Sequence, residues 1–180
     1  IGSILQDTIE SEYEIVVVDN NSSDDTKASV LIYESKVNYF FEPNTSFTRA
    51  RHTGAENAQG DILLYIDDDV IVLPGSIDKI VETFNKYPEC GVVAGKILPK
   101  YEVEPPEWCL ACEDTFNGWS LYSPDVYPHL ANGFQEVDFA AGPMMAVSKK
   151  VYDLVGGFPP DTLGVETNDG KGTFNKLYVG

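Results

Sequence analysis

Three consecutive aspartates, Asp67, Asp68 and Asp69, directly follow the apolar run at residues 62–66. Two like charges about 4 Å apart repel by roughly 1 kcal/mol in water, and by more beside a low-dielectric interior. Mg²⁺ and Mn²⁺ prefer carboxylate oxygens, and Mg²⁺ commonly combines one or two carboxylates with the phosphate oxygens of a substrate. Because such a cation would offset the repulsion, the triplet predicts a Mg²⁺ or Mn²⁺ site at the end of a buried strand.

A second polar turn follows a β-branched run, since Asp19 and Asn20 come directly after the strand-like residues 13–18. In open α/β sheets, ligands bind just beyond the carboxyl ends of the strands. Parallel strands end at the same edge of a sheet, so we expect Asp19 and Asn20 to face the same crevice as the aspartate triplet. For Asp19 alone, the common alternative is that it simply forms the turn.

Basic residues are scarce, and the only two arginines of the chain are Arg49 and Arg51. Both are expected in the first turns of a helix, where the helix N-terminus already favours anions. An arginine there adds a bidentate hydrogen-bond donor for phosphate. The alternative for each arginine is a solvated helix face, and we expect His52 to be a surface or packing residue.

Strand-like runs alternate with helical patterns along the chain, which predicts βαβ units on a largely parallel sheet. Gly60 is expected to end the helix that carries Arg51. The residues from 159 onward are rich in Gly, Asp and Thr and are expected to be flexible. We expect strands at residues 13–19, 37–41, 61–66, 90–97, 137–141 and 144–148, and helices at 26–35, 48–59, 74–86 and 149–155.

The composition fits one domain of ordinary size, with 180 residues and 43% hydrophobic residues. The net charge of −17 argues against nucleic-acid binding through a basic face. No apolar run approaches the roughly 18 residues that a membrane-spanning helix needs, and we find no signal peptide. We expect Cys90, Cys109 and Cys112 to be ordinary thiols in a reducing compartment, although the spacing of the last two also occurs in redox and zinc sites.

The chain lacks the Gly-x-Gly-x-x-Gly pattern of dinucleotide-binding domains, and it lacks a P-loop. Instead, an ordered set of short motifs resembles the family 2 glycosyltransferases with a GT-A fold. This resemblance extends from Ile1 to about Phe158. The motifs that carry it are residues 15–26, 50–55, 60–61 and 67–69, then Pro74, and finally residues 155–158.

The resemblance implies a GT-A-type, Rossmann-like α/β fold with three α/β/α layers and a mostly parallel central sheet. Residues 1–98 would form the nucleotide-binding half of a single domain, and residues 99–180 the acceptor-side half. It implies a strand before Ile1 and a catalytic base beyond Gly180. Within the chain, Glu166 and Asp169 are the alternative candidates for the base.

The resemblance also assigns roles at the predicted site. Asp19 and Asn20 would hold the nucleobase, and Arg51 would lie near the base and the phosphates. Asp67 and Asp69 correspond to the Asp-x-Asp element of the family. Asp69 would bind the metal, and Asp67 would be a second ligand or would join Asp68 at the ribose.

The implied activity is metal-dependent transfer of a sugar, with inversion, from a nucleotide-diphosphate donor to a hydroxyl group. We expect a UDP-sugar as the donor and a sugar, lipid-linked or other hydroxyl compound as the acceptor, as in polysaccharide biosynthesis of the cell envelope. The segment from Gly142 to Ala146 would line the sugar pocket, although Met144 stands where the family often has Asn or Asp. Residues 99–136, with Trp108 and Trp119, would recognise the acceptor or form a hydrophobic cluster under a loop.

Two other functions are compatible with the same residues. A phosphohydrolase of the haloacid-dehalogenase kind would use Asp67 as the nucleophile and Asp69 as the acid and base, although its motif normally follows the first strand of the fold. A domain that binds nucleotide-sugars without turnover is the second alternative. We expect a cytoplasmic location, with peripheral attachment at the inner face of the membrane as a variant of it.

Overall fold

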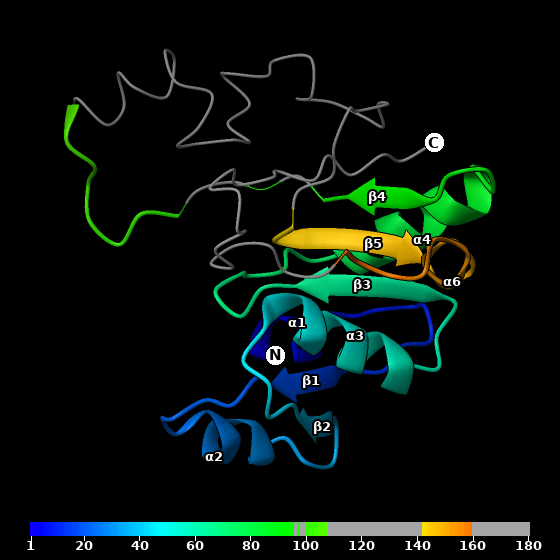
Figure 1. Cartoon of the computed structure of the whole chain (residues 1–180). Coiled ribbons are helices and arrows are strands. Elements are labelled where there is room, and N and C mark those ends of the chain that lie inside the picture. Colours follow the sequence, from blue (N-terminus) through cyan, green and yellow to red (C-terminus); the bar gives the residue numbers. More distant parts are fainter. Residues whose placement is uncertain (96, 98–99, 108–141, 160–180) are drawn as a thin grey trace, which may run out of the picture.

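The computed structural model describes residues 1–95, 97, 100–107 and 142–159 (Figure 1). These residues form an α/β arrangement, with helices packed on strands. The strands are β1 (Val16–Asp19), β2 (Asn38–Phe41), β3 (Ile62–Ile66), β4 (Val92–Ala94) and β5 (Met144–Ser148). The helices are α1 (Gly2–Leu5), α2 (Thr26–Leu31), α3 (Phe47–Asn57), α4 (Ser76–Lys86) and α6 (Lys149–Val155).

The strands pair in two groups. β1 and β2 are parallel, with Val16 opposite Asn38. β5 lies between β3 and β4 and is antiparallel to both. In Figure 1 β1, β3 and β4 point the same way, and β5 points the opposite way. The predicted common direction therefore holds for these three strands, and β5 is the exception.

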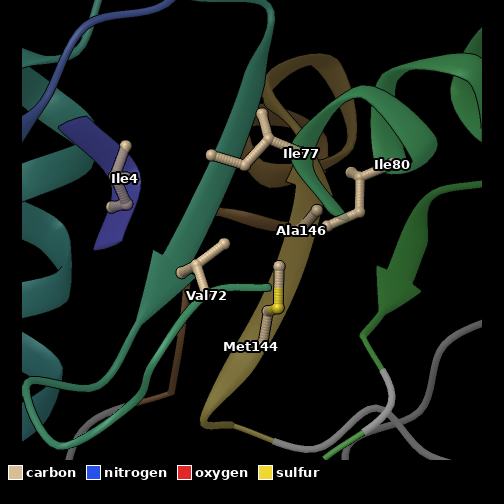
Figure 2. Close-up of a cluster of buried hydrophobic side chains, with 6 residues drawn as sticks. All are labelled: Ile4, Val72, Ile77, Ile80, Met144 and Ala146. Carbon is tan, nitrogen blue, oxygen red and sulfur yellow. The ribbon is translucent and has the colours of Figure 1, made fainter. Parts of the chain in front are cut away.

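The central core lies on one face of β3 and β5. Alternate residues of a strand point to opposite faces, so Leu64 and Ile66 share a face with their cross-strand partners Ala146 and Met144. Helix α4 covers this face with apolar side chains at helical spacing. Figure 2 shows the buried cluster, which consists of Ile4, Val72, Ile77, Ile80, Met144 and Ala146.

Helix α3 and Phe158 cover the opposite face of β3. Tyr65 points to this face, and its ring lies 5.5 Å from the Arg51 guanidinium carbon of α3 and 5.2 Å from the Phe158 ring, centroid to centroid. Figure 1 shows α3 in front of the strands and α4 behind them. Helices on both faces of the strands agree with the predicted three layers.

Several element ends differ from the prediction. The helix predicted to end at Gly60 ends at Asn57, and Ala58 is extended (φ −79°, ψ 141°). The Glu14 carboxylate accepts the Gln59 N–H at 2.6 Å, so a side chain from another part of the chain fixes this exit. Helix α2 ends at Leu31 instead of residue 35, and the chain continues through turns. β4 is also shorter than the predicted strand at 90–97.

Some predictions concern residues outside the described part of the chain. These are the strand at 137–141, the flexible tail from residue 160 onward, and the roles of Trp108, Trp119, Cys109 and Cys112. They remain predictions. Among the described residues, Cys90 is a free thiol. No described helix combines the length and apolar character that a membrane crossing requires.

The core predicts a clear contrast between two identical substitutions. Ile80 is 5% exposed in the central cluster, whereas Ile32 is 75% exposed just after α2. Ile80→Ala should lower the free energy of unfolding by about 2–5 kcal/mol, because it leaves a cavity. Ile32→Ala should change it by about 0.5 kcal/mol or less. Urea unfolding followed by circular dichroism measures both, and equal losses would contradict the described core.

Candidate active site at the ends of β1 and β3

The aspartate triplet forms a tight turn at the end of β3. The Asp67 N–H donates to the Pro143 carbonyl at 3.1 Å, which continues the pairing of β3 with the chain leading into β5. The Asp67 carbonyl accepts the Val70 N–H at 3.2 Å. This bond closes a turn with Asp68 and Asp69 at its two corners, and both residues are exposed. The strand end therefore presents carboxylates to solvent, as the sequence predicts.

Arg51 lies beside the first of these carboxylates. Its Nη2 is 3.8 Å from Asp67 Oδ1, and the two side chains are 15% and 35% exposed. The same nitrogen is 3.5 Å from the Gly142 carbonyl oxygen. A Cβ atom at position 142 would lie only 3.1 Å from this nitrogen, so glycine permits the close approach. Arg51 thus joins α3, the aspartate turn and the chain before β5.

Three aromatic rings surround the Arg51 guanidinium. Its central carbon lies 4.0 Å from the ring centre of Phe47, 5.3 Å from Phe158 and 5.5 Å from Tyr65. A cation over aromatic faces is attracted to them, most strongly where water is excluded. Burial raises the pKa of Tyr65 above its ordinary value. Its hydroxyl is buried without a hydrogen-bond partner among the described residues. These rings restrict the orientation of Arg51.

Asp19 is buried at the end of β1 and is held by two donors. Its Oδ1 accepts the Ser22 N–H at 2.8 Å, and its Oδ2 accepts the Tyr39 hydroxyl at 2.7 Å. These hydrogen bonds, first that from Ser22 and then that from Tyr39, lower the pKa of Asp19 despite its burial. Asp19 therefore stabilises the turn after β1, which is the alternative to ligand binding that the sequence offers for this residue. Its contact with a nucleobase stays a prediction.

Asn20 connects the end of β1 to the loop before α3. Its Nδ2 donates to the carbonyls of Asn44 (2.7 Å) and Glu42 (3.3 Å), and its Oδ1 accepts the Ser46 N–H (2.8 Å). Ser46 is the N-cap of α3 and accepts the Arg49 N–H through its side chain. The structure thus places Asn20 where it fixes the start of the helix that carries Arg51, and its contact with a nucleobase stays a prediction.

Glu42 is a third acidic residue at a strand end, and it was not among the predicted site residues. This buried carboxylate accepts hydrogen bonds from the Asn44 N–H (2.9 Å), the Asn44 side chain (2.8 Å) and the Thr53 hydroxyl (2.8 Å). The bond from the Asn44 N–H, followed by that from Thr53, lowers the pKa of Glu42. Glu42 directly follows β2 as Asp67 directly follows β3, and Asp19 is the last residue of β1, so the signal of an acidic residue at a strand end was available in the sequence.

Comparison with known proteins places the chain in a family. The family model described as glycosyl transferase family 2 matches residues 1–156. The chain belongs to this family. The resemblance noted in the sequence is therefore confirmed, and the chain is a glycosyltransferase domain by descent.

Relatives and a solved structure agree with this assignment. A glucosyl-dolichyl phosphate glucuronosyltransferase of Haloferax volcanii is 25% identical over 171 residues, covering 90% of this chain and 50% of that protein. A poly-beta-1,6-N-acetyl-D-glucosamine synthase of Staphylococcus epidermidis is 30% identical over 103 residues, covering 51% and 24%. The chain thus spans half or less of the length of these relatives.

The structural match concerns the fold. The mannosyltransferase PcManGT from Pyrobaculum calidifontis, solved in complex with GDP-Man and Mn²⁺, has a TM-score of 0.59 and 21% identity to this chain. The match covers 83% of this chain and 39% of that one. It confirms the predicted GT-A-type α/β fold.

The donor set of this glycosyltransferase domain fits a hard cation that also takes ligands from a substrate. No group of three or more His, Cys, Asp or Glu side chains within the described ranges is arranged to hold a metal by itself. Asp69 is exposed and Asp67 is partly exposed, so both have room for a further ligand. One or two carboxylates completed by phosphate oxygens is the ordinary arrangement for Mg²⁺.

The hydrogen bonds of Asp19 predict a pH effect. Tyr39→Phe removes a donor, so the pKa of Asp19 should rise toward its ordinary value of 3.8. A carboxyl group whose folded-state pKa is depressed stabilises the fold above its unfolded-state pKa, and this contribution is lost as the pH falls through the folded-state value. The variant should therefore begin to unfold at a higher pH than the parent protein.

Carbon-13 NMR titration of the aspartate carboxyl groups measures the first effect, and circular dichroism during acid titration measures the second. Tyr33→Phe is the control, because the Tyr33 hydroxyl makes no hydrogen bond within the described part of the chain. An Asp19 titration that is the same in the Tyr39 variant and the parent would contradict the described network.

Proposed function

We propose that this chain binds the nucleotide-sugar donor of an inverting glycosyltransferase and transfers the sugar to an acceptor hydroxyl with the help of Mg²⁺ or Mn²⁺. The observation that carries the proposal is the pairing of Arg51 with Asp67 beside two exposed aspartates at the end of β3. This arrangement offers both signs of charge within one small area. A diphosphate needs cationic partners, and a cation needs carboxylates.

The donor would lie across the ends of β1 and β3. Asp19 and Asn20 would hold the nucleobase at the end of β1, and Asp68 or Asp67 would bind the ribose. Asp69, with Asp67, would hold the cation, which when bound would neutralise the charge of the diphosphate. Arg51 would donate to the diphosphate oxygens from the other side.

Transfer with inversion requires an in-line displacement. The acceptor oxygen forms a bond to the anomeric carbon while the bond from that carbon to the diphosphate oxygen breaks, and a general base takes the acceptor proton. Glu166 and Asp169 are the candidates for this base within the chain. Both lie outside the described residues, so their role stays a prediction.

The relatives guide the choice of donor and acceptor. A UDP-sugar remains our first choice of donor, and the GDP-Man bound to PcManGT makes a GDP-sugar the obvious comparison. The name of the Haloferax relative supports a lipid-linked acceptor, and that of the Staphylococcus relative supports polysaccharide synthesis. We therefore propose a cytoplasmic domain that works at the inner face of the membrane in the building of the cell envelope.

Family membership argues against the phosphohydrolase alternative. In this chain the acidic motif follows β3, the third strand along the described sequence, and not the first strand as in the haloacid-dehalogenase pattern. The chain also belongs to a family of glycosyltransferases. Binding of a nucleotide-sugar without turnover is the alternative that the following experiment separates from transfer.

Calorimetry with UDP, GDP and dTDP, each with Mn²⁺, tests the proposal. One of these nucleotides should bind, and its affinity should fall at least tenfold, or about 1.4 kcal/mol, when Mn²⁺ is omitted or when Asp69 is replaced by Asn. Asp61→Asn is the matched control, because Asp61 precedes β3 and so lies at the other end of the same strand. It should bind like the parent protein.

Two results would count against the proposal. If none of the three nucleotides binds in a metal-dependent manner to the folded protein, the proposed site is wrong. If a nucleotide binds but the corresponding sugar donors are neither hydrolysed nor transferred to any acceptor, the chain is a binding domain.

A further inference from the structure

Both ring nitrogens of His52 have hydrogen-bond partners. Nδ1 is 2.5 Å from the Tyr152 hydroxyl, and Nε2 is 3.1 Å from the Phe158 carbonyl oxygen. A carbonyl oxygen only accepts, so Nε2 must carry the hydrogen. In the neutral ring, Nδ1 then accepts the hydrogen of the Tyr152 hydroxyl. The partners thus assign one tautomer, and His52 joins α3 to α6 and to the chain that follows α6.

The backbone after α6 is shaped to reach this ring. Gly156 and Gly157 have φ angles of +77° and +79°, a left-handed conformation that favours glycine. A Cβ atom on Gly157 would lie 2.3 Å from His52 Cε1, whereas one on Gly156 would meet nothing within 4 Å. Gly157 therefore allows the backbone to pass directly against the imidazole, and Gly156 is needed only for the turn.

The segment held by His52 supplies one of the rings that surround Arg51. The Phe158 ring centre is 5.3 Å from the Arg51 guanidinium carbon. The same ring packs edge-to-face against Tyr65, with their centres 5.2 Å apart. Because His52 bonds the backbone of Phe158, it controls where this ring sits. The Phe158 ring lies over Arg51, which directly precedes His52 in the sequence.

We propose that His52 is a positioning residue for Arg51, acting through Phe158. The imidazole holds the Phe158 ring against the guanidinium, which keeps Arg51 directed at Asp67 and at the site of the diphosphate. This role rests on the proposed function for its effect on donor binding. The sequence suggests only a surface or packing role for His52. In the proposed role, the affinity for the nucleotide depends on His52 although this residue does not touch the nucleotide.

The two glycines provide a matched test. Gly156→Ala and Gly157→Ala both place alanine at a positive φ angle, but only the second places a methyl group against His52. With Mn²⁺ and whichever of UDP, GDP and dTDP binds the parent protein best, Gly157→Ala should raise the dissociation constant about tenfold. Gly156→Ala should raise it less than twofold. Equal effects of the two changes would overturn the proposal.

Replacement of the histidine separates positioning from mere packing. In His52→Gln the amide N–H takes the place of Nε2 and can still donate to the Phe158 carbonyl, whereas His52→Phe fills the space without a donor. We expect His52→Gln to bind the nucleotide within threefold of the parent protein and His52→Phe to bind about tenfold more weakly, with both variants folded by circular dichroism. Equal binding by the two variants would contradict the role of the hydrogen bond.

NMR gives a readout that does not need a nucleotide. The chain has two histidines and two arginines, so His129→Gln and Arg49→Lys assign the signals of His52 and Arg51. His52 should show the neutral tautomer with its hydrogen on Nε2. The Arg51 Nε–H signal should carry a ring-current shift to which Phe158 contributes beside Phe47 and Tyr65, and Gly157→Ala and His52→Phe should change this shift, whereas Gly156→Ala should not.

These spectra distinguish the two proposals from each other. If no nucleotide binds the parent protein but the spectra behave as expected, the proposed function fails and the positioning of Arg51 by His52 stands. If His52 carries its hydrogen on Nδ1, or if the Arg51 signal is the same in all variants, the positioning role is wrong whatever the nucleotide data show.

Discussion

The charge pairing between Arg51 and Asp67 is the interaction on which the rest of the site depends. The chain carries a net charge of −17, and β3 ends in three adjacent carboxylates, so the surroundings of the site are strongly negative. At 3.8 Å and an effective dielectric constant of 20, two opposite charges attract by about 4 kcal/mol before the cost of desolvation. One guanidinium thus offsets part of the repulsion and makes the area acceptable to a diphosphate.

Helix α3 is the element that brings the parts of the site together. Its N-terminus is fixed by Asn20 at the end of β1, and Thr53, further along, donates to Glu42 at the end of β2. Between these points it presents Arg51 to the end of β3 and His52 to the chain after α6. The ends of three strands and the chain after α6 therefore meet on one helix of eleven residues. This explains how short strands can still position several polar groups.

Much of this architecture could be predicted from local patterns. The apolar run of β3 and the aspartates after it depend on neighbouring residues, and these predictions agree with the structure. The end of α3 was mispredicted because Glu14, more than forty residues earlier, bonds the backbone just beyond the helix. The strand β5 was predicted, but its antiparallel direction was not. An apolar run shows that a strand forms, but it does not show which neighbour the strand pairs with.

Some side-chain roles at the site could likewise be predicted from local sequence, and others depend on distant partners. The importance of Asp67 to Asp69 can be predicted from the sequence, because three adjacent like charges at a strand end repel one another whatever their tertiary contacts are. The use of Asn20 as a backbone clamp, and of His52 as a link to Phe158, depends on partners 22 to 106 residues away in the sequence. The spacing of residues along the sequence does not reveal which distant residues these side chains contact. The family resemblance drew attention to Asn20 as a residue near the nucleobase, but it did not indicate which groups of the protein Asn20 contacts.

The most direct test of the central claim compares the two arginines of α3. Arg51 lies among aromatic rings beside Asp67, and Arg49, on the same helix, is exposed. A lysine retains the charge but loses the planar group that stacks on rings and forms paired hydrogen bonds. With Mn²⁺, the calorimetric affinity for the nucleoside diphosphate that binds best should fall about tenfold in Arg51→Lys and stay within twofold in Arg49→Lys. Unchanged affinity in Arg51→Lys would contradict the account.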